Sequence, residues 1–257
     1  MSQEIKVLTA TDLHRDKGLY QQLATAVKKH RPDILALVGD FLHGQRDNTD
    51  RYSTVEAAQF LSRLKVPEII FLRGNHEDSA LWEFADEWTR GGREFHLLDK
   101  QAFAYGPLVT VGFPCLLGAL SEPGDGNTDK WLPPLIRQYG SAARTLWLMH
   151  EPVYGTPLSK TDGVLAGNIE WTQAVERYSP NLVVFGHDHD TSRRKKIWNA
   201  KLEGGTVCVN LGQDSTLHYG LVRLVFDGSQ PTSPKSIRIT AFPINQTLTV
   251  EKKGNQK

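Results

Sequence analysis

Five short apolar runs in this sequence are each followed by side chains that bind metals or carry protons. Val, Ile, Leu and Phe dominate the runs, as is typical of strands buried inside a sheet protein. The groups that follow them are Asp12-Leu13-His14, Gly39-Asp40, Gly74-Asn75-His76-Glu77, His150 and Gly186-His187-Asp188-His189. The pattern requires a fold built on strands, and it makes the five strand ends the candidate site.

Strands and helices alternate in the first third of the chain. Pro32 ends the first predicted helix, and Ser53 with Glu56 forms a capping box before the second. Asp78 is a candidate N-cap for the third helix, where we expect Trp82 to lie in the core. The strands are predicted at 5–10, 33–38 and 68–72, with helices around 19–27, 58–64 and 81–84. This order predicts right-handed crossovers and a parallel sheet covered by helices.

The pattern changes beyond residue 90. Short strands at 95–98, 102–105 and 108–111 favour an antiparallel meander, and the polar stretch 116–130 is a candidate rim of the active site. Further strands are predicted at 145–149, 182–185, 206–211, 221–226 and 236–242, with a helix at 169–178. Trp131 and Trp171 could line a base-stacking wall or fill the core. With no linker in the sequence, we expect one domain over 1–251 and a polar tail at 252–257.

Composition excludes several classes of protein. The net charge of +1 gives no footprint for bulk nucleic-acid binding. Cys115 and Cys208 are too few for a disulfide framework or a cysteine zinc site, and their apolar context predicts two buried thiols. The polar start of the chain lacks a signal-peptide pattern, and no apolar run approaches the roughly 20 residues of a membrane span. We therefore expect a cytoplasmic enzyme without membrane contact.

The five strand ends are expected to lie on one side of the sheet, because ligands in α/β proteins bind at the carboxyl ends of strands. Taken singly, each has another explanation: Asp12 as a helix cap, Gly39-Asp40 as a turn, His150 as a packed histidine. Taken together, two carboxylates, an amide oxygen and several imidazoles suit two metals such as manganese, iron or zinc. The tight turn that would aim His187 and His189 at one centre is expected at Gly186.

These motifs resemble those of the calcineurin-like metallophosphoesterase superfamily, in the same order, over positions 12 to 189. Asn210-Leu211-Gly212 also resembles a strand end of that family. The resemblance implies an α/β fold, a four-layer α-β-β-α sandwich in which two mixed sheets pack face to face with helices outside. The antiparallel middle and the β-rich C-terminal part fit this architecture.

The resemblance also implies roles for the residues at the strand ends. Metal-held hydroxide would attack phosphorus, and His76 would assist the leaving group, with Asp78 as a candidate to orient it. Arg73 and Arg46 are candidate contacts to the substrate phosphate, together with Asn75 and His76. The ligands implied are Asp12, His14 and His189 for the first metal, Asn75, His150 and His187 for the second, and Asp40 as the bridge between them.

Departures from the protein phosphatase pattern bear on the substrate. Those enzymes carry an arginine soon after the second motif, where this chain has His43 and Gly44, with Arg46 out of register. His150 is followed by Glu-Pro rather than Gly-Gly. We therefore expect a small phosphodiester or nucleotide as substrate. The alternatives are a phosphomonoesterase, including a protein serine/threonine phosphatase, and a non-catalytic binding module on the same fold.

Overall fold

A seven-stranded sheet forms one half of the protein, within the residues that the computed structural model describes: 2–42, 50–117, 119–161, 164–165, 167–189, 197–228 and 232–250. Its strand order is β15-β14-β13-β1-β2-β3-β4, in which β1 to β4 run parallel and β13 to β15 pair antiparallel. The bounds are β1 Ser2–Ala10, β2 Ile34–Val38, β3 Glu68–Leu72, β4 His96–Leu97, β13 Tyr219–Asp227, β14 Ser236–Phe242 and β15 Gln246–Val250.

A six-stranded sheet in the order β11-β12-β10-β7-β6-β5 forms the other half of the described structure. Its four inner strands run parallel, and the two edge strands pair antiparallel. The bounds are β5 Ala102–Tyr105, β6 Leu108–Phe113, β7 Leu146–Met149, β10 Leu182–Phe185, β11 Asn199–Lys201 and β12 Val207–Asn210. A separate two-stranded ladder joins β8 (Lys160–Thr161) to β9 (Val164–Leu165).

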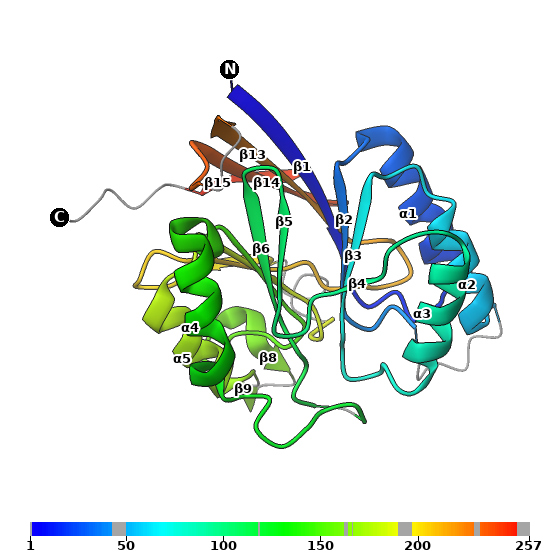
Figure 1. Cartoon of the computed structure of the whole chain (residues 1–257), viewed down its shortest axis with the longest axis horizontal. Coiled ribbons are helices and arrows are strands. Elements are labelled where there is room, and N and C mark those ends of the chain that lie inside the picture. Colours follow the sequence, from blue (N-terminus) through cyan, green and yellow to red (C-terminus); the bar gives the residue numbers. More distant parts are fainter. Residues whose placement is uncertain are drawn as a thin grey trace.

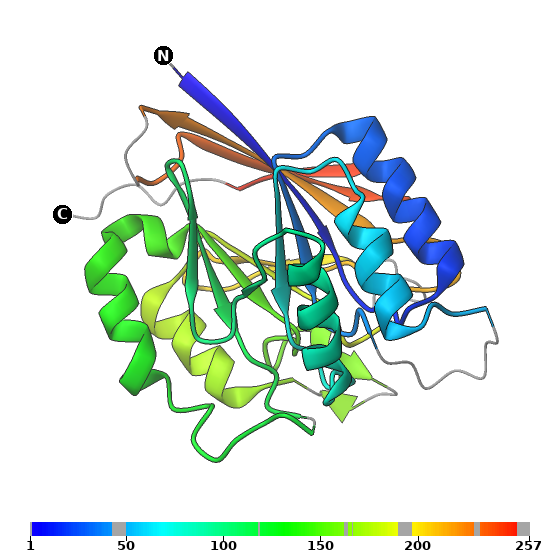
Figure 2. The ribbon, with the colours of Figure 1, turned by 45° about the vertical axis from the view of Figure 1, so that its right-hand side comes forward.

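The two sheets pack face to face, and helices cover their outer faces. Figure 1 shows α1 (Lys17–His30), α2 (Thr54–Ser62) and α3 (Ala80–Arg90) on one side, and α4 (Thr128–Tyr139) and α5 (Ile169–Tyr178) on the other. The turned view in Figure 2 keeps the same layers. Short 3-10 turns, η1 (Gly140–Arg144) and η2 (Pro157–Ser159), flank β7.

Three buried clusters correspond to the three contacts between these layers. Between the sheets, Val7, Val38, Leu148 and Val184 belong to one continuous apolar core. The second cluster joins α1, α2 and α3 to the first sheet, and the third joins α4 and α5 to the second sheet. Alternate residues of the inner strands enter opposite clusters, which explains why these strands are apolar throughout. The expected four-layer sandwich is confirmed.

Local signals in the sequence set most helix ends. The expected capping box of Ser53 and Glu56 is present at the start of α2. Elsewhere in the fold, Cys115 and Cys208 are buried free thiols, as expected. Asp78 also acts at a helix start, because its Oδ1 accepts the N–H of Ala80 at 2.9 Å. The helix α4 was not expected, since Pro133 and Pro134 lie inside it and proline normally interrupts a helix.

Two expectations about the middle of the chain are wrong. The meander is broken up, because β4 joins the first sheet parallel to β3 and only β5 and β6 form an antiparallel pair. Trp82 does not lie in the core but is 53% exposed, since α3 buries Leu81, Phe84 and Trp88 on its other face. Trp171 fills the core, and Trp131 is partly buried against Phe113. The single-domain assignment stays a prediction, and the tail 252–257 lies outside the described residues.

Across the part of the chain that the structure describes, every helix is too short or too polar to cross a membrane.

We expect Phe113→Ala to lower the free energy of unfolding by about 3–5 kcal/mol. The ring is fully buried and contacts Trp147 and Trp171 at centroid distances of 4.7 and 5.2 Å, so its loss leaves a cavity. Urea unfolding measures the change. The matched control is Trp82→Ala, which removes an exposed ring and should cost no more than about 0.5 kcal/mol. Equal losses in the two variants would contradict the packing described for α3 and the second sheet.

Candidate metal centre

The five strand ends meet where the carboxyl edges of the two sheets come together. Strands β1, β2 and β3 bring their ends from the first sheet, and β7 and β10 bring theirs from the second. The cross-sheet contact is direct, since the backbone N–H of His187 after β10 donates to Asp12 Oδ2 after β1 at 3.1 Å. The site therefore lies between the two halves of the fold.

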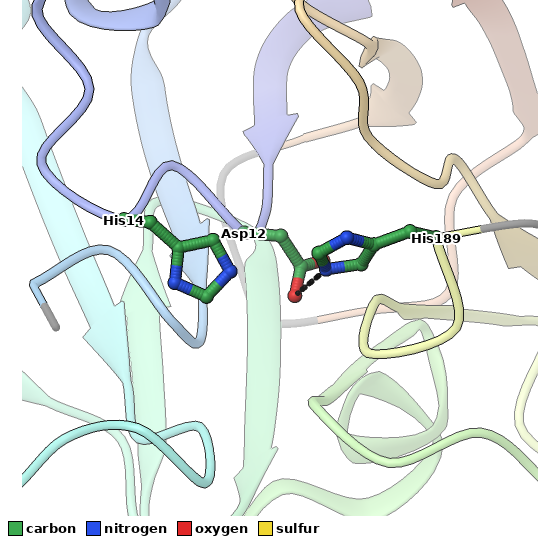
Figure 3. Close-up of side chains that lie close together, drawn as sticks. All are labelled: Asp12, His14 and His189. Atoms are coloured by element: carbon green, nitrogen blue, oxygen red, sulfur yellow. Dashed lines mark ion pairs between the residues drawn. The ribbon is translucent and has the colours of Figure 1, made fainter. Parts of the chain in front are cut away.

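Asp12, His14 and His189 form one group of donors, in which one ligand atom of each lies within 4.8 Å of the others. Figure 3 shows the two rings on either side of the Asp12 carboxylate, with His189 Nε2 at 3.1 Å from Asp12 Oδ1. Asp12 is fully buried, and Oδ1 lacks a partner with hydrogen-bond geometry in the described structure. The other oxygen, Oδ2, accepts from Thr11 Oγ1 at 2.7 Å, which leaves Oδ1 directed at the two histidines.

His150 is the centre of a second group. Its Nδ1 lies 3.0 Å from the carbonyl oxygen of Val38, which can only accept, so Nδ1 carries a proton. Its Nε2 faces two more oxygens, Asn75 Oδ1 at 3.0 Å and Asp40 Oδ2 at 3.3 Å. Asn75 Oδ1 also lies 2.9 Å from His187 Nδ1. Asn75, His150 and His187 therefore converge on one point.

Asp40 lies between the two groups. With Asp12 and His150 it forms a fully buried set whose ligand atoms lie within 4.8 Å of one another. Its Oδ1 accepts the backbone N–H of His76 at 2.8 Å, and its Oδ2 lies 3.9 Å from His76 Nε2. This set shares Asp12 with the first group and His150 with the second, so the whole cluster is continuous.

Four of these residues have a left-handed backbone, which non-glycine residues adopt at a cost: Asp12 (φ 56°), His14 (48°), Asp40 (51°) and His187 (68°). Bonds between the loops hold two of them, since Asp12 N donates to Gly39 O and His14 N to Asp40 O. The sequence predicts the turn after β10 at Gly186. In the structure His187 has the left-handed backbone of this turn instead.

Gly186 and Gly74 are needed for close approach. A Cβ on Gly186 would overlap Thr11 Oγ1 and Asp12 Oδ2, and a Cβ on Gly74 would overlap the Asp40 carboxylate. The two glycines let the ends of β10 and β3 come within contact of the carboxylates.

Glu77 belongs to the motif Gly74-Asn75-His76-Glu77, but no role for it was foreseen from the sequence. It is buried, and its carboxylate accepts three backbone N–H groups, from Asp40 (2.9 Å), Leu42 (3.0 Å) and Gly74 (2.6 Å). These donors belong to the loops after β2 and β3. Its acceptor bonds could not be read from the sequence, because they depend on two loops that lie 37 residues apart.

The electrostatics of the cluster follow from burial and opposite charge. Burial favours the neutral form of Asp12, but His189, His150 and His14 outweigh it and hold the Asp12 pKa far below its usual range. Burial likewise opposes a charged His150, yet Asp40 and Asp12 raise the pKa of His150 to about 10. Burial and the charge of Asp40 raise the pKa of Glu77 to about 7. The cluster therefore attracts positive charge.

The sequence matches the family described as calcineurin-like phosphoesterase over residues 5–191. The chain belongs to this family. No curated protein matches the sequence.

Solved structures share the fold of this calcineurin-like phosphoesterase at low identity. A dimetal phosphatase from Danio rerio is 12% identical with a TM-score of 0.65, covering 97% of this chain and 99% of its own. TT1561 of Thermus thermophilus is 15% identical with a TM-score of 0.60, and the match covers 86% of this chain and 94% of TT1561. GAP50, the anchor in the inner membrane complex of Plasmodium, is 11% identical with a TM-score of 0.60, and the match covers 98% of this chain and 90% of GAP50. Such likeness shows the fold alone.

The donor set fits the divalent metals that this family binds. Among the described residues, Asp12 Oδ1 is buried and accepts no hydrogen bond of regular geometry, and it faces His189 Nε2 at 3.1 Å, so the two atoms could share a cation. His150 donates its far N–H to a backbone carbonyl, the arrangement that fixes a metal-binding imidazole. Carboxylate, amide and imidazole ligands suit manganese, iron and zinc alike.

The two arginines predicted to contact the substrate, Arg73 and Arg46, differ in what the structure shows of them. The guanidinium of Arg73 bonds to the Asp99 carboxylate and the Leu120 carbonyl, and its contact with a substrate phosphate stays a prediction. Arg46 lies among residues 43–49, outside the described residues. His76 is in place: its side chain is 17% exposed beside Asp40, and its ring lies 5.3 Å from that of His14. That Asp78 orients His76 stays a prediction.

Replacing Glu77 by Ala should lower the free energy of unfolding by more than about 3 kcal/mol, because three buried N–H groups lose their acceptor. Glu77→Gln keeps one carbonyl oxygen as an acceptor, so its free energy of unfolding should fall by less than that of Glu77→Ala. Urea unfolding gives the free energies, and metal analysis of each variant should show reduced binding, since Asp40 and Gly74 are no longer held.

Glu83→Ala is the matched control for this experiment, because Glu83 is exposed on α3. If Glu77→Ala were as stable as that control and bound metal equally, the described role of Glu77 would be wrong.

Proposed function

We propose that this chain is a dinuclear metal-dependent hydrolase of phosphoesters. The observation that carries the proposal is the continuous cluster in which Asp12 belongs to two groups of ligand atoms, each within 4.8 Å. One metal needs four to six ligands, whereas seven candidate side chains converge here. Two cations at such a site hold phosphate oxygens, lower the pKa of a water and offset charge on the leaving group.

The ligands divide between two positions. Asp12, His14 and His189 would hold the first metal, and Asn75, His150 and His187 the second. The contacts support this division, because Asn75 Oδ1 lies 3.0 Å from His150 Nε2 and 2.9 Å from His187 Nδ1. Asp40 would bridge the two metals, which agrees with its place between Asp12 and His150.

His76 would protonate the leaving oxygen. It lies at the edge of the buried cluster and keeps contact with solvent, so it can exchange protons, unlike the fully buried His150. Its backbone N–H bonds to Asp40 Oδ1, which fixes the residue next to the proposed bridging ligand. These features suit a proton donor.

A small phosphodiester or a nucleotide is the proposed substrate class, with a phosphomonoester, including a phosphoprotein, as the second candidate. An arginine that clamps a monoester dianion uses two free guanidinium donors. Arg73 stands next to the site, but Asp99 and Leu120 engage its guanidinium. This favours the diester, whose single negative charge needs no such clamp.

The first measurement is metal content together with hydrolysis of bis(p-nitrophenyl) phosphate and p-nitrophenyl phosphate, on chelator-stripped protein reloaded with manganese. We expect two metals per chain, activity that depends on them, and a clear preference for the diester. A preference for the monoester would reverse the substrate proposal. Metal without turnover on either ester would favour a non-catalytic binding module on the same fold.

His76→Ala should lower kcat by about 10²- to 10⁴-fold while two metals per chain remain, because it loses a proton donor and no ligand. Asp40→Asn gives the contrast, since loss of a bridging carboxylate should remove both activity and metal. His96→Ala is the matched control: this half-buried histidine pairs with Glu68 at 3.4 Å, away from the cluster, and its loss should leave kcat unchanged. Loss of both metals from His76→Ala would overturn its assignment.

A further inference from the structure

A cavity lies beside the candidate metal centre, between α3 and the segment 119–127, here called the rim loop. Its volume is about 460 Å³, within the usual range for small-molecule sites. Trp82, Leu97 and Leu120 supply its apolar lining, and Arg73, Asp99 and Asp125 its polar lining.

Trp82 is the unusual member of this lining. It is 53% exposed in the first turn of α3, six residues after His76, and lies outside the apolar face by which α3 packs on the sheet. An indole left this open on the surface, at the wall of a cavity, presents a flat π-surface on which another ring can stack.

The charged groups of the cavity are paired with one another. Arg73 bonds to Asp99 and lies 3.7 Å from Asp125, and Lys100 bonds to the other oxygen of Asp125. Glu122 adds an exposed carboxylate to the lining. With two cations against three carboxylates, the cavity disfavours a second phosphate and suits an uncharged group that can form hydrogen bonds.

Contacts of the rim loop place this cavity next to the proposed second metal. Arg73, which donates to the Leu120 carbonyl, directly precedes Gly74 and Asn75. Just before the rim loop, the Leu116 N–H donates to Glu151, the residue after His150, at 2.5 Å. Ser121 Oγ closes the loop by donating to the Cys115 carbonyl at 2.8 Å. The loop is thus tied to both strand ends that carry Asn75 and His150.

We infer that this cavity binds the planar organic group of the substrate, a nucleobase stacked on Trp82, while the phosphoester lies at the metals. The inference rests on the proposed function and narrows its substrate class to nucleoside phosphoesters. Stacking of a base on an aromatic side chain is worth about 1–3 kcal/mol, which corresponds to roughly a 5- to 150-fold change in affinity.

The test compares two diesters that share one leaving group: thymidine 5′-(p-nitrophenyl phosphate) and methyl p-nitrophenyl phosphate. The wild-type protein should prefer the thymidine ester. In Trp82→Ala the ratio of kcat/KM between the two esters should fall by about tenfold, and Trp82→Phe should restore most of it. The exposed Tyr154 lines a different cavity, so Tyr154→Ala should leave the ratio unchanged. An unchanged ratio in Trp82→Ala would overturn the inference.

A binding measurement separates failure of this inference from failure of the proposed function. Calorimetry on manganese-loaded protein should show weaker binding of thymidine 5′-monophosphate to Trp82→Ala than to wild type, with equal binding of inorganic phosphate. This holds whether or not the protein hydrolyses either ester. Equal affinity of wild type and Trp82→Ala for the nucleotide would overturn the stacking site even in an active enzyme.

Discussion

The carboxylate of Glu77 is the interaction on which the geometry of the site depends. Two strand ends of the first sheet must present Asp40 and Asn75 to the same point, and parallel neighbours diverge once their ladder ends. By accepting the N–H groups of Asp40, Leu42 and Gly74, one buried side chain replaces the missing ladder bonds. Its burial makes this arrangement specific, because a buried donor that loses its acceptor is costly.

Hydrogen bonds between loops also stabilise the unfavourable left-handed backbone conformations at the site. Asp12, His14 and His187 have left-handed backbones, and bonds between loops rather than local preference hold the first two of these turns. At Gly74 and Gly186, a side chain would collide with a carboxylate. The same few contacts therefore set both the conformation of each loop and the distance between the loops.

Much of this could be predicted from the sequence. The apolar runs at β1, β2, β3, β7 and β10 are short, buried on both faces and bounded by Asp, Asn or His, so the strands and the convergence of their ends follow from the pattern. The role of Glu77, the exposure of Trp82 and the pairing of β4 could not be predicted. Each depends on which distant segment lies opposite, and local periodicity carries no information about that. The helix α4 was not predicted because Pro133 and Pro134 lie inside it. Its packing against the second sheet outweighs the local cost of proline.

The donor atoms of the centre come from two sheets, and contacting residues such as Asp12 and His187 lie 175 positions apart in the sequence. No fragment containing one sheet alone can form the site, so metal affinity reports on the assembly of both halves. Conversely, a cation held jointly by Asp12 and His189 would act as a cross-link that closes a very long loop, and its binding energy would add to the stability of the whole chain. The contacts at the junction between the sheets therefore serve both the proposed metal centre and the stability of the fold.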